Sequence, residues 1–417
     1  MSVPKLRFKE FDGDWSESKL KDCIDSIDSG WSPQCESYPA DENEWAVLKT
    51  TSVDWDGFKA NFNKKLPSNL EARFEIEVKP NDILVTRAGP TERVGVVAVV
   101  PHNVRSKLMI SDKLIRLKAN NENNPEFLGI SLSSVKCQNQ LQSKTSGLAK
   151  SQTNISQKIL CDVSLMTPAK AEQTKIASFL SNVDEKISQL TQKHQLLSQY
   201  KQGMMQKLFS QQIRFKAGDG SEFGEWEDTK LGELTKVITK GTTPSSLGEK
   251  FEESGINFIK IESLSSNGKF LLDKFAYIDE NTHNKLARSK LEHDDILFSI
   301  AGALGRVAII SRDYLPANTN QALAIIRLKD KKNTRYIYYF LNSDYVKKII
   351  DAESVQLAQA NFSLGQLANL DVLIPCLEEQ TKIANFLSAI DQKIEVVAQQ
   401  IEQAKTWKKG LLQQMFV

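Results

Sequence analysis

The chain contains the ten residues Glu172-Gln-Thr-Lys-Ile-Ala-Ser-Phe-Leu-Ser181 and repeats nine of them later in Glu379-Gln-Thr-Lys-Ile-Ala-Asn-Phe-Leu-Ser388. The two copies begin 207 residues apart, and the match continues without a gap as far as Phe209 and Phe416. Self-similarity over such a length does not arise by chance and indicates a repeated structural unit. The 417 residues are therefore two copies of one plan.

Both repeated stretches predict a long helix. Apolar residues alternate there at spacings of four and three, which is the heptad pattern of a coiled-coil seam. Neither stretch contains proline, whereas Pro168 and Pro375 stand just before them. We predict helical spacers at 169–212 and 376–417, which pair as an antiparallel coiled coil. The predicted seam consists of Ile176, Leu180, Val183, Ile187, Leu190, Leu197, Ile383, Leu387, Ile390, Ile394, Val397 and Ile401.

Weaker matches precede each helix. Gly30-Trp-Ser-Pro33 corresponds to Gly241-Thr-Thr-Pro244, and Asp82-Ile-Leu84 corresponds to Asp295-Ile-Leu297. An Ala-Gly pair and an Arg-Val pair follow the second motif in both copies. Each spacer therefore follows a module that has diverged much further than the spacer itself.

The modules, residues 1–168 and 213–375, are predicted to be mixed α/β. In the first, 82–86 and 94–100 have the composition of a buried strand pair across a Gly-Pro turn. Short helices are predicted at 126–133 and, in the second module, at 335–341. The predicted fold class is α+β: two similar mixed α/β domains joined by two long helices that form an antiparallel coiled coil, with an internal pseudo-twofold repeat.

The overall composition is that of an ordinary globular protein. Lys and Arg number 54 against 52 Asp and Glu, so no general basic excess argues for nucleic acid. The longest apolar run, Val94 to Val100, is far shorter than the roughly 20 residues that span a bilayer. The five cysteines include no Cys-x-x-Cys pair, which is typical of a reducing compartment. We expect a cytoplasmic protein without membrane contact.

No set of catalytic residues is recognisable. The sequence has neither a phosphate-binding P-loop nor the Asn-Pro-Pro-aromatic signature of amino-group methyltransferases. Glu77-Val-Lys79 resembles part of a nuclease motif, but the other copy lacks it, and we interpret it as surface charge. The four histidines have no metal-ligand spacing. We predict no catalytic residue, metal or cofactor in this chain.

Local charge is less even than the total. Lys79–Lys118 carries eight basic residues against three acidic ones, and so does Lys170–Lys216. Such a run is often only a solvated face, but here amides and hydroxyls accompany it. Arg and Lys suit phosphate and guanine, and Asn and Gln suit adenine. The candidate DNA-binding residues are Lys49, Thr50, Thr51, Arg87, Lys113, Lys150, Gln152, Asn154, Lys260, Gln359 and Asn361.

A helical rod that carries two similar modules could hold two readers at a fixed separation. A helix of about 38 residues is about 57 Å long, which corresponds to roughly 17 base pairs. Because the modules differ in sequence while the helices are similar, we expect them to recognise two different short base sequences within one asymmetric DNA site.

The chain resembles the specificity subunit of a type I restriction-modification system over essentially its whole length. The resemblance rests on the two Glu-Gln-Thr-Lys-Ile-Ala-x-Phe-Leu-Ser helix starts, the Gln-x-Asn turns at 152–154 and 359–361, and the paired module motifs. One departure is that the second copy is less basic, with Ile300 at the position of Arg87 and Leu357 at that of Lys150.

The resemblance implies a subunit without catalysis, whose two target-recognition domains each read one half of a bipartite site on double-stranded DNA. It implies that the helices set the spacer and dock two copies of an adenine-N6 methyltransferase subunit, and that restriction (endonuclease and translocase) subunits join the complex. S-adenosylmethionine, ATP and Mg are then expected on those partners. Two alternatives remain at this point: a coiled-coil adaptor that does not read sequence, and a nuclease or methyltransferase within this chain.

Overall fold

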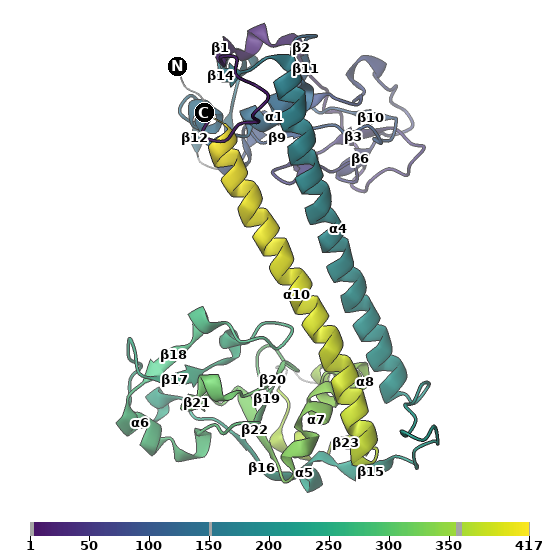
Figure 1. Ribbon diagram of the computed structural model, residues 1–417, viewed down its shortest axis with the longest axis vertical. Coiled ribbons are helices and arrows are strands. Elements are labelled where there is room, and N and C mark those ends of the chain that lie inside the picture. Colours follow the sequence, from purple (N-terminus) through teal and green to yellow (C-terminus); the bar gives the residue numbers. More distant parts are fainter. Residues whose placement is uncertain (1–3, 150–151, 356–360, 417) are drawn as a thin grey trace. The chain divides into compact units, whose positions relative to one another are not determined.

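The computed structural model describes residues 4–149, 152–355 and 361–416 (Figure 1). The chain divides into two compact units: the first consists of Met1–Thr191 with Gln399–Val417, and the second of Gln192–Ala398. Each unit therefore contains one module, part of the long helix that joins the modules and part of the C-terminal long helix. Among the described residues, no helix is both long enough and apolar enough to cross a membrane.

The two long helices expected from the heptads are present, as α4 (Lys170–Phe209) and α10 (Leu377–Met415). In the first unit, Lys408 Nζ of α10 lies 2.5 Å from Asp184 Oδ1 of α4. In the second unit, Lys201 Nζ of α4 lies 2.7 Å from Asp391 Oδ1 of α10.

These contacts give the direction of the helices within each unit. In the first unit the N-terminal half of α4 meets the C-terminal half of α10, and in the second unit the C-terminal half of α4 meets the N-terminal half of α10, which is the pattern of antiparallel helices. The predicted seam residues are all buried or half-buried. Several also pack against the modules: Ile176 and Leu180 belong to the main core of the first unit, and Ile383 and Leu387 to that of the second.

The first module contains a four-stranded antiparallel sheet in the order β2-β11-β7-β9 and a three-stranded sheet in the order β10-β3-β6. Ile83 and Val85 of β7 face the core shared with α4, whereas Leu84 faces the core shared with the three-stranded sheet. The alternation follows from the two-residue period of a strand. The strands are β1 (Ser16–Lys19), β2 (Ile24–Ser29), β3 (Ala46–Leu48), β4 (Val53–Asp54), β5 (Gly57–Phe58), β6 (Asn63–Lys65), β7 (Ile83–Thr86), β8 (Ala88–Gly89), β9 (Val97–Val99), β10 (Leu108–Met109), β11 (Leu114–Ala119), β12 (Ser146–Ala149), β13 (Gln152–Asn154) and β14 (Ser164–Thr167).

The second module repeats this topology. Its four-stranded sheet has the order β16-β22-β19-β20, and its three-stranded sheet the order β18-β17-β21. Ile296 and Phe298 of β19 face the helix-side core, and Leu297 faces the other core. The strands are β15 (Glu227–Lys230), β16 (Thr235–Lys240), β17 (Ile256–Ile259), β18 (Ala276–Ile278), β19 (Ile296–Ser299), β20 (Val307–Ile309), β21 (Ala317–Thr319), β22 (Leu323–Leu328) and β23 (Asp371–Ile374).

The short helices predicted near 126–133 and 335–341 are confirmed as α1 and α7. The Asn124 side chain caps α1 by accepting from the Phe127 N–H at 3.0 Å. Phe127 then packs edge-on against Trp15, as Tyr336 of α7 packs against Trp226. The helices of the modules are α1 (Pro125–Leu132), α2 (Val135–Gln142), α3 (Gln157–Cys161), α5 (Leu231–Leu234), α6 (Glu280–Lys285), α7 (Thr334–Leu341), α8 (Asp344–Val355) and α9 (Leu364–Ala368).

The repeated Glu-Gln motif fastens each module to its helix. The buried Glu172 carboxylate accepts from Arg7 Nε and Nη2, both at 2.7 Å, and from Trp15 Nε1 at 3.3 Å. Gln173 Nε2 donates to the Pro168 carbonyl at 2.9 Å, directly before the helix. An acidic side chain in the first turn also suits the positive end of the helix dipole.

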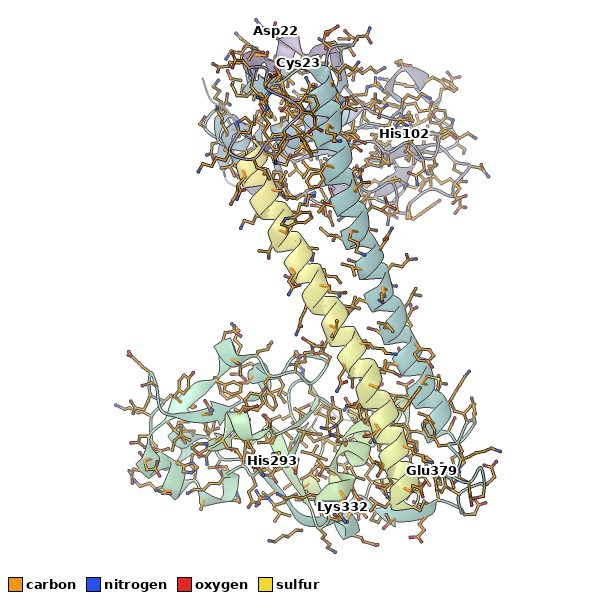
Figure 2. All side chains as sticks on the ribbon, viewed as in Figure 1. Asp22, Cys23, His102, His293, Lys332 and Glu379 are labelled. Atoms are coloured by element: carbon orange, nitrogen blue, oxygen red, sulfur yellow. The ribbon has the colours of Figure 1, made fainter. Side chains whose placement is uncertain are left out.

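The second copy of the motif makes the same contacts at Glu379, which Figure 2 labels near the start of α10. Its carboxylate accepts from Arg214 Nε at 3.1 Å and Nη2 at 2.7 Å, and from Trp226 Nε1 at 3.0 Å. Gln380 Nε2 donates to the Pro375 carbonyl at 2.8 Å. We call each set of Glu, Arg and Trp a clamp. The clamps explain why the sequence repeats so closely at these positions.

Candidate nucleic-acid interface

In the first module, three candidate residues from distant parts of the sequence meet at one edge. Arg87 lies between β7 and β8, and its N–H donates to the Lys113 carbonyl at 2.8 Å. The Arg87 carbonyl accepts from the Ile155 N–H at 3.0 Å. Strand β8 pairs with β13, with Ala88 opposite Asn154. Lys113 and Asn154 are exposed and Arg87 is half-exposed, so all three side chains are accessible to a ligand.

Parallel strand pairing brings Lys49, Thr50 and Thr51 to the same side of the module. Strand β10 runs parallel to β3, with Leu108 opposite Ala46. Lys49–Thr51 follow the carboxyl end of β3, and the turn that contains Lys113 follows β10. Because the carboxyl ends of parallel strands point the same way, both segments emerge at one edge. We call this surface the first recognition edge.

The second module builds an equivalent edge on the same backbone contacts. The Ile300 N–H donates to the Ala322 carbonyl at 2.9 Å, and the Ile300 carbonyl accepts from the Phe362 N–H at 2.9 Å. Ala301 forms a bridge with Asn361. Strand β21 is parallel to β17, after which Lys260 follows. Lys260 and Asn361 thus reach the second recognition edge.

The side chains of the two edges differ. Ile300 occupies the place of Arg87, and Ala322 that of Lys113. Lys260 occupies the place of Lys49, but its Nζ forms an ion pair with Glu262 at 2.8 Å. The second edge therefore presents less free positive charge from the predicted positions.

Three candidate residues cannot be placed fully. Lys150 and Gln359 lie outside the described residues. The backbone of Gln152 belongs to β13, whereas its side chain is outside what the structure describes. Their roles remain predictions.

The basic run of the first module is not an open positive patch. Arg116 is 3% exposed and donates to Asp28 Oδ2 at 2.6 Å, and Arg93 donates to Asp54 Oδ1 at 2.7 Å. Lys107 Nζ donates to the Asn43 carbonyl at 2.8 Å. Fewer basic side chains of this run are therefore free to contact a polyanion than the charge count of the sequence indicates.

The expectation that Glu77 is surface charge was wrong. Its side chain belongs to the interior of the first module, since the residue is 8% exposed. The carboxylate accepts from the Lys107 N–H at 2.6 Å. Glu77 therefore supports the loop that carries Lys107.

Sequence reasoning missed two exposed arginines near the Gly-x-x-Pro turns. The Arg73 guanidinium lies 4.0 Å from the ring centroid of Trp31, which follows Gly30. In the second module Arg288 Nη2 donates at 2.8 Å to Thr242 Oγ1, which follows Gly241. The turns themselves were recognisable, but the arginines come from other parts of the sequence and no local spacing marks them.

The glycines of these turns allow a close backbone approach. A Cβ on Gly30 would lie 1.8 Å from the Ile110 carbonyl oxygen, and one on Gly241 would lie 2.0 Å from that of Thr319. Such distances are incompatible with any side chain. The turns are thereby held against the strands that lead into the recognition edges.

Sequence reasoning also missed a hydrogen-bonded pair of side chains at each edge. One member of the pair is a carboxylate in the first module and an amide in the second. Ser32 and Asp112 hydrogen-bond at the first edge, whereas Thr243 and Gln321 hydrogen-bond at the second. A carboxylate can only accept, whereas a Gln amide both donates and accepts. The two edges therefore present different hydrogen-bonding patterns at equivalent positions.

The described residues contain no group of three or more His, Cys, Asp or Glu side chains arranged to hold a metal ion. Figure 2 shows His102 in the loops of the first module and His293 in those of the second. His293 lies 3.5 Å from Asp294, its neighbour in sequence. The described surface offers polar recognition edges and no recognisable metal centre.

Comparison with known proteins identifies the repeat. The family model described as "Type I restriction modification DNA specificity domain" matches residues 13–199 and again 224–406. The EcoEI specificity subunit of Escherichia coli is 37% identical over 187 residues, which cover 44% of this chain and 31% of that protein. The MjaVIII specificity subunit of Methanocaldococcus jannaschii is 27% identical over 421 residues, which cover 97% of this chain and 94% of that protein.

The architecture also has a solved counterpart. The S subunit of a type I restriction-modification system from M. genitalium superposes with a TM-score of 0.62 at 16% identity, covering 100% of this chain and 99% of the other. At this identity the likeness concerns the fold. The family match, in contrast, occurs twice and extends over most of the sequence. The chain therefore belongs to the type I restriction-modification DNA specificity family and is a specificity subunit with two recognition domains.

Proposed function

We propose that each recognition edge binds one half of an asymmetric, two-part site on double-stranded DNA. The observation that carries this proposal is that the two edges share backbone contacts but differ in exposed polar side chains. In the first domain, Lys49, Arg87 and Lys113 hold phosphates, and Asn154 and Asp112 contact base edges. In the second, Arg288 supplies the charge, and Asn361 and Gln321 contact bases. Phosphate contacts position the protein, and base contacts give the sequence preference.

The two long helices set the distance between the half-sites and dock the catalytic partners. The repeated sequence of α4 and α10 presents two similar surfaces, which suits two copies of one partner. We assign that partner as an adenine-N6 methyltransferase that carries S-adenosylmethionine. Restriction subunits that use ATP and Mg join through the complex. This chain then contributes recognition and no catalytic group.

The decisive experiment expresses this chain together with its methyltransferase subunit in a host that lacks adenine methylation. Modified adenines are then mapped across the genome. We expect one two-part motif with a fixed gap of unspecified bases, absent when this chain is omitted. Exchanging one recognition domain should change one half of the motif and leave the other unchanged.

A coiled-coil adaptor without sequence reading predicts a different result. Methylation would then require the chain but show no shared motif, or the motif would survive exchange of either domain. A single continuous motif would contradict the two-part site, even if the chain were required for methylation.

A further inference from the structure

The first unit contains a large, mostly apolar pocket between its module and its long helices. The pocket has a volume of about 930 Å³, and all residues that line it belong to this unit. Val97 and Val99 of β9 and Ile130 of α1 contribute apolar surface, and Asp184 of α4 and Lys408 of α10 contribute an ion pair. Neither of the recognition edges includes these residues.

The second unit shows what fills the equivalent place. Helices α1 and α7 correspond through Phe127 and Tyr336, which make matching contacts with Trp15 and Trp226. In this alignment Tyr338 stands where the first unit has Gly129, and Tyr339 stands where it has Ile130. The aromatic side chains that the second unit carries on its own helix are thus absent from the pocket of the first.

Tyr339 defines the chemistry of the filled site. It is 4% exposed, its hydroxyl donates to Asp391 Oδ2 at 2.7 Å, and Lys201 pairs with Asp391 Oδ1 at 2.7 Å. Burial and the Asp391 carboxylate raise the pKa of Tyr339 well above its ordinary value, so the hydroxyl keeps its proton. The site therefore combines an apolar slot with a charged hydrogen-bond acceptor at its end.

The first unit retains that acceptor. Asp184 and Lys408 occupy the positions of Asp391 and Lys201 in the repeat and form the corresponding ion pair. An ionised carboxylate has lone pairs for more than one donor, so Asp184 can accept a hydroxyl while it stays paired. What the first unit lacks is the ring that would deliver the hydroxyl.

A second difference concerns the charges beside the pocket. In the second unit Lys269, on the hairpin beside Tyr338, pairs with Glu395 of α10. The corresponding residue of α4 is Ser188, which is exposed and carries no charge. Around the open pocket Trp55 and Val135 are 50% and 71% exposed, respectively. Exposed apolar side chains around a pocket are typical of a protein interface in which an aromatic anchor is inserted.

We propose that this pocket binds a tyrosine side chain of a partner protein. The ring lies against Val97, Val99 and Ile130, and the hydroxyl donates to Asp184, as Tyr339 does to Asp391 in the second unit. The identity of the partner as the methyltransferase subunit rests on the proposed function, whereas the chemistry of the pocket does not. The two units are then unequal. The site beside Asp391 is filled by the chain's own Tyr339, and the pocket beside Asp184 is filled by a tyrosine of the partner.

The test uses the full chain and 4-fluorophenol as a probe for the tyrosine side chain, followed by fluorine NMR. We expect saturable binding at millimolar concentration, with fluorobenzene about tenfold weaker because it cannot donate to Asp184. Ile130→Tyr should abolish probe binding, because the new side chain copies Tyr339 and fills the pocket. Asp184→Ala should remove the preference for the phenol while leaving fluorobenzene binding unchanged.

A reciprocal variant provides the matched control. Tyr338→Gly with Tyr339→Ile copies the first unit into the second and should create a second probe site. Absence of probe binding to the wild-type chain, or binding that survives Ile130→Tyr in a folded protein, would overturn the proposal. Circular dichroism and thermal unfolding establish folding for each variant.

The partner is tested separately by titrating the purified methyltransferase subunit onto wild-type chain and Ile130→Tyr. We expect the variant to bind one of the two copies at least tenfold more weakly. Equal binding of both copies would refute a tyrosine anchor from this partner. Failure of the wild-type chain to bind any methyltransferase would instead contradict the proposed function, and the probe experiment would still decide the chemistry of the pocket.

Discussion

The clamps and the recognition edges are under opposite physical constraints within the same repeat. At the clamps, Glu172 and Glu379 make the same three hydrogen bonds to an arginine and a tryptophan. At the edges the backbone contacts are equally alike, but Arg87 is replaced by Ile300. The clamp residues are fixed because each buried polar atom needs its partner. Polar side chains at the edges are free to differ because water satisfies them until a ligand arrives, whereas Ile300 itself is buried in the core of its unit.

Two classes of residue follow from this difference. Residues that hold the fold together, such as those of the clamps, form the frame, and residues that contact DNA, such as the exposed polar residues of the edges, form the reader. A residue of the frame should affect stability in either unit to a similar extent, and its replacement should not change which sequence is preferred. A residue of the reader should leave stability almost unchanged and alter affinity or preference in one half-site. Each of the following changes tests that separation.

The largest effect is expected from breaking a clamp. Glu379→Ala leaves Arg214 and the Trp226 N–H without their buried acceptor, and Glu172→Ala does the same to Arg7 and Trp15. Removing one partner of a buried ion pair costs about 3 kcal/mol. Chemical denaturation should show losses of this order for both variants.

Glu378→Ala is the matched control, because its side chain is 58% exposed and pairs with Lys382 at 3.2 Å one turn away. It should change the unfolding free energy by less than about 0.5 kcal/mol. A clamp variant as stable as this control would show that the repeated motif is retained for some other reason.

Gly241→Ala tests the turn behind the second recognition edge. Its Cβ would lie 2.0 Å from the Thr319 carbonyl oxygen, so the turn must move away from β21. Forcing atoms into a packed site costs about 1–3 kcal/mol. We also expect weaker binding to DNA, because Thr242 and Arg288 move with the turn.

Gly218→Ala is the control for this change, because among the described residues no heavy atom beyond its two chain neighbours lies within 4 Å of its Cβ position. Stability and DNA affinity are measured on the same preparations. If Gly241→Ala bound DNA normally despite lower stability, the turn would belong to the frame and not to the reader.

Asn154→Ala and Asn361→Ala test base reading at equivalent places in the two domains. Each should relax the preference at a single position of its own half-site, with a loss of about 1–3 kcal/mol for the preferred base. Binding to a library of sites that differ by single base pairs measures this directly. A uniform loss over all sequences would reassign the residue to phosphate contact.

Arg87→Ala and Ile300→Ala form an unequal pair at one backbone position. The arginine variant should bind every sequence more weakly and reduce the slope of log affinity against log salt by about 1. The isoleucine variant should leave that slope unchanged. Equal slopes for both variants and the wild-type chain would remove Arg87 from the interface.

Features with a period in the sequence were predictable, whereas those made by distant contacts were not. The heptads predicted α4 and α10, and the repeated Asp-Ile-Leu motifs marked the central strands β7 and β19. The sequence did not reveal why Glu172 recurs, because its partners Arg7 and Trp15 lie more than 150 residues away. A carboxylate that folds onto such partners has no local signature.

Only some residues of the candidate site were predictable, because contacts between distant segments leave no local pattern in the sequence. Lys49, Arg87, Lys113 and Asn154 come together because strand pairing unites segments that the sequence separates. Arg73 and Arg288 were missed because each reaches its edge through a side-chain contact with another segment. Counting charge also failed, since Arg116 was counted as surface charge although it is buried against Asp28.

The smallest effect is expected at Lys260, the counterpart of Lys49. Lys260 pairs with Glu262 and lies 5.7 Å from the Phe251 ring centroid, so part of its charge is already neutralised within the domain. Lys260→Ala should therefore change DNA affinity by less than about twofold, whereas Lys49→Ala should reduce the salt slope by about 1. Glu262→Ala sharpens the comparison, because it frees Lys260 and should raise the affinity of the second domain. If Lys260→Ala weakened binding as much as Lys49→Ala, the ion pair would have to open on contact with DNA, and the two edges would be more alike than their resting side chains indicate.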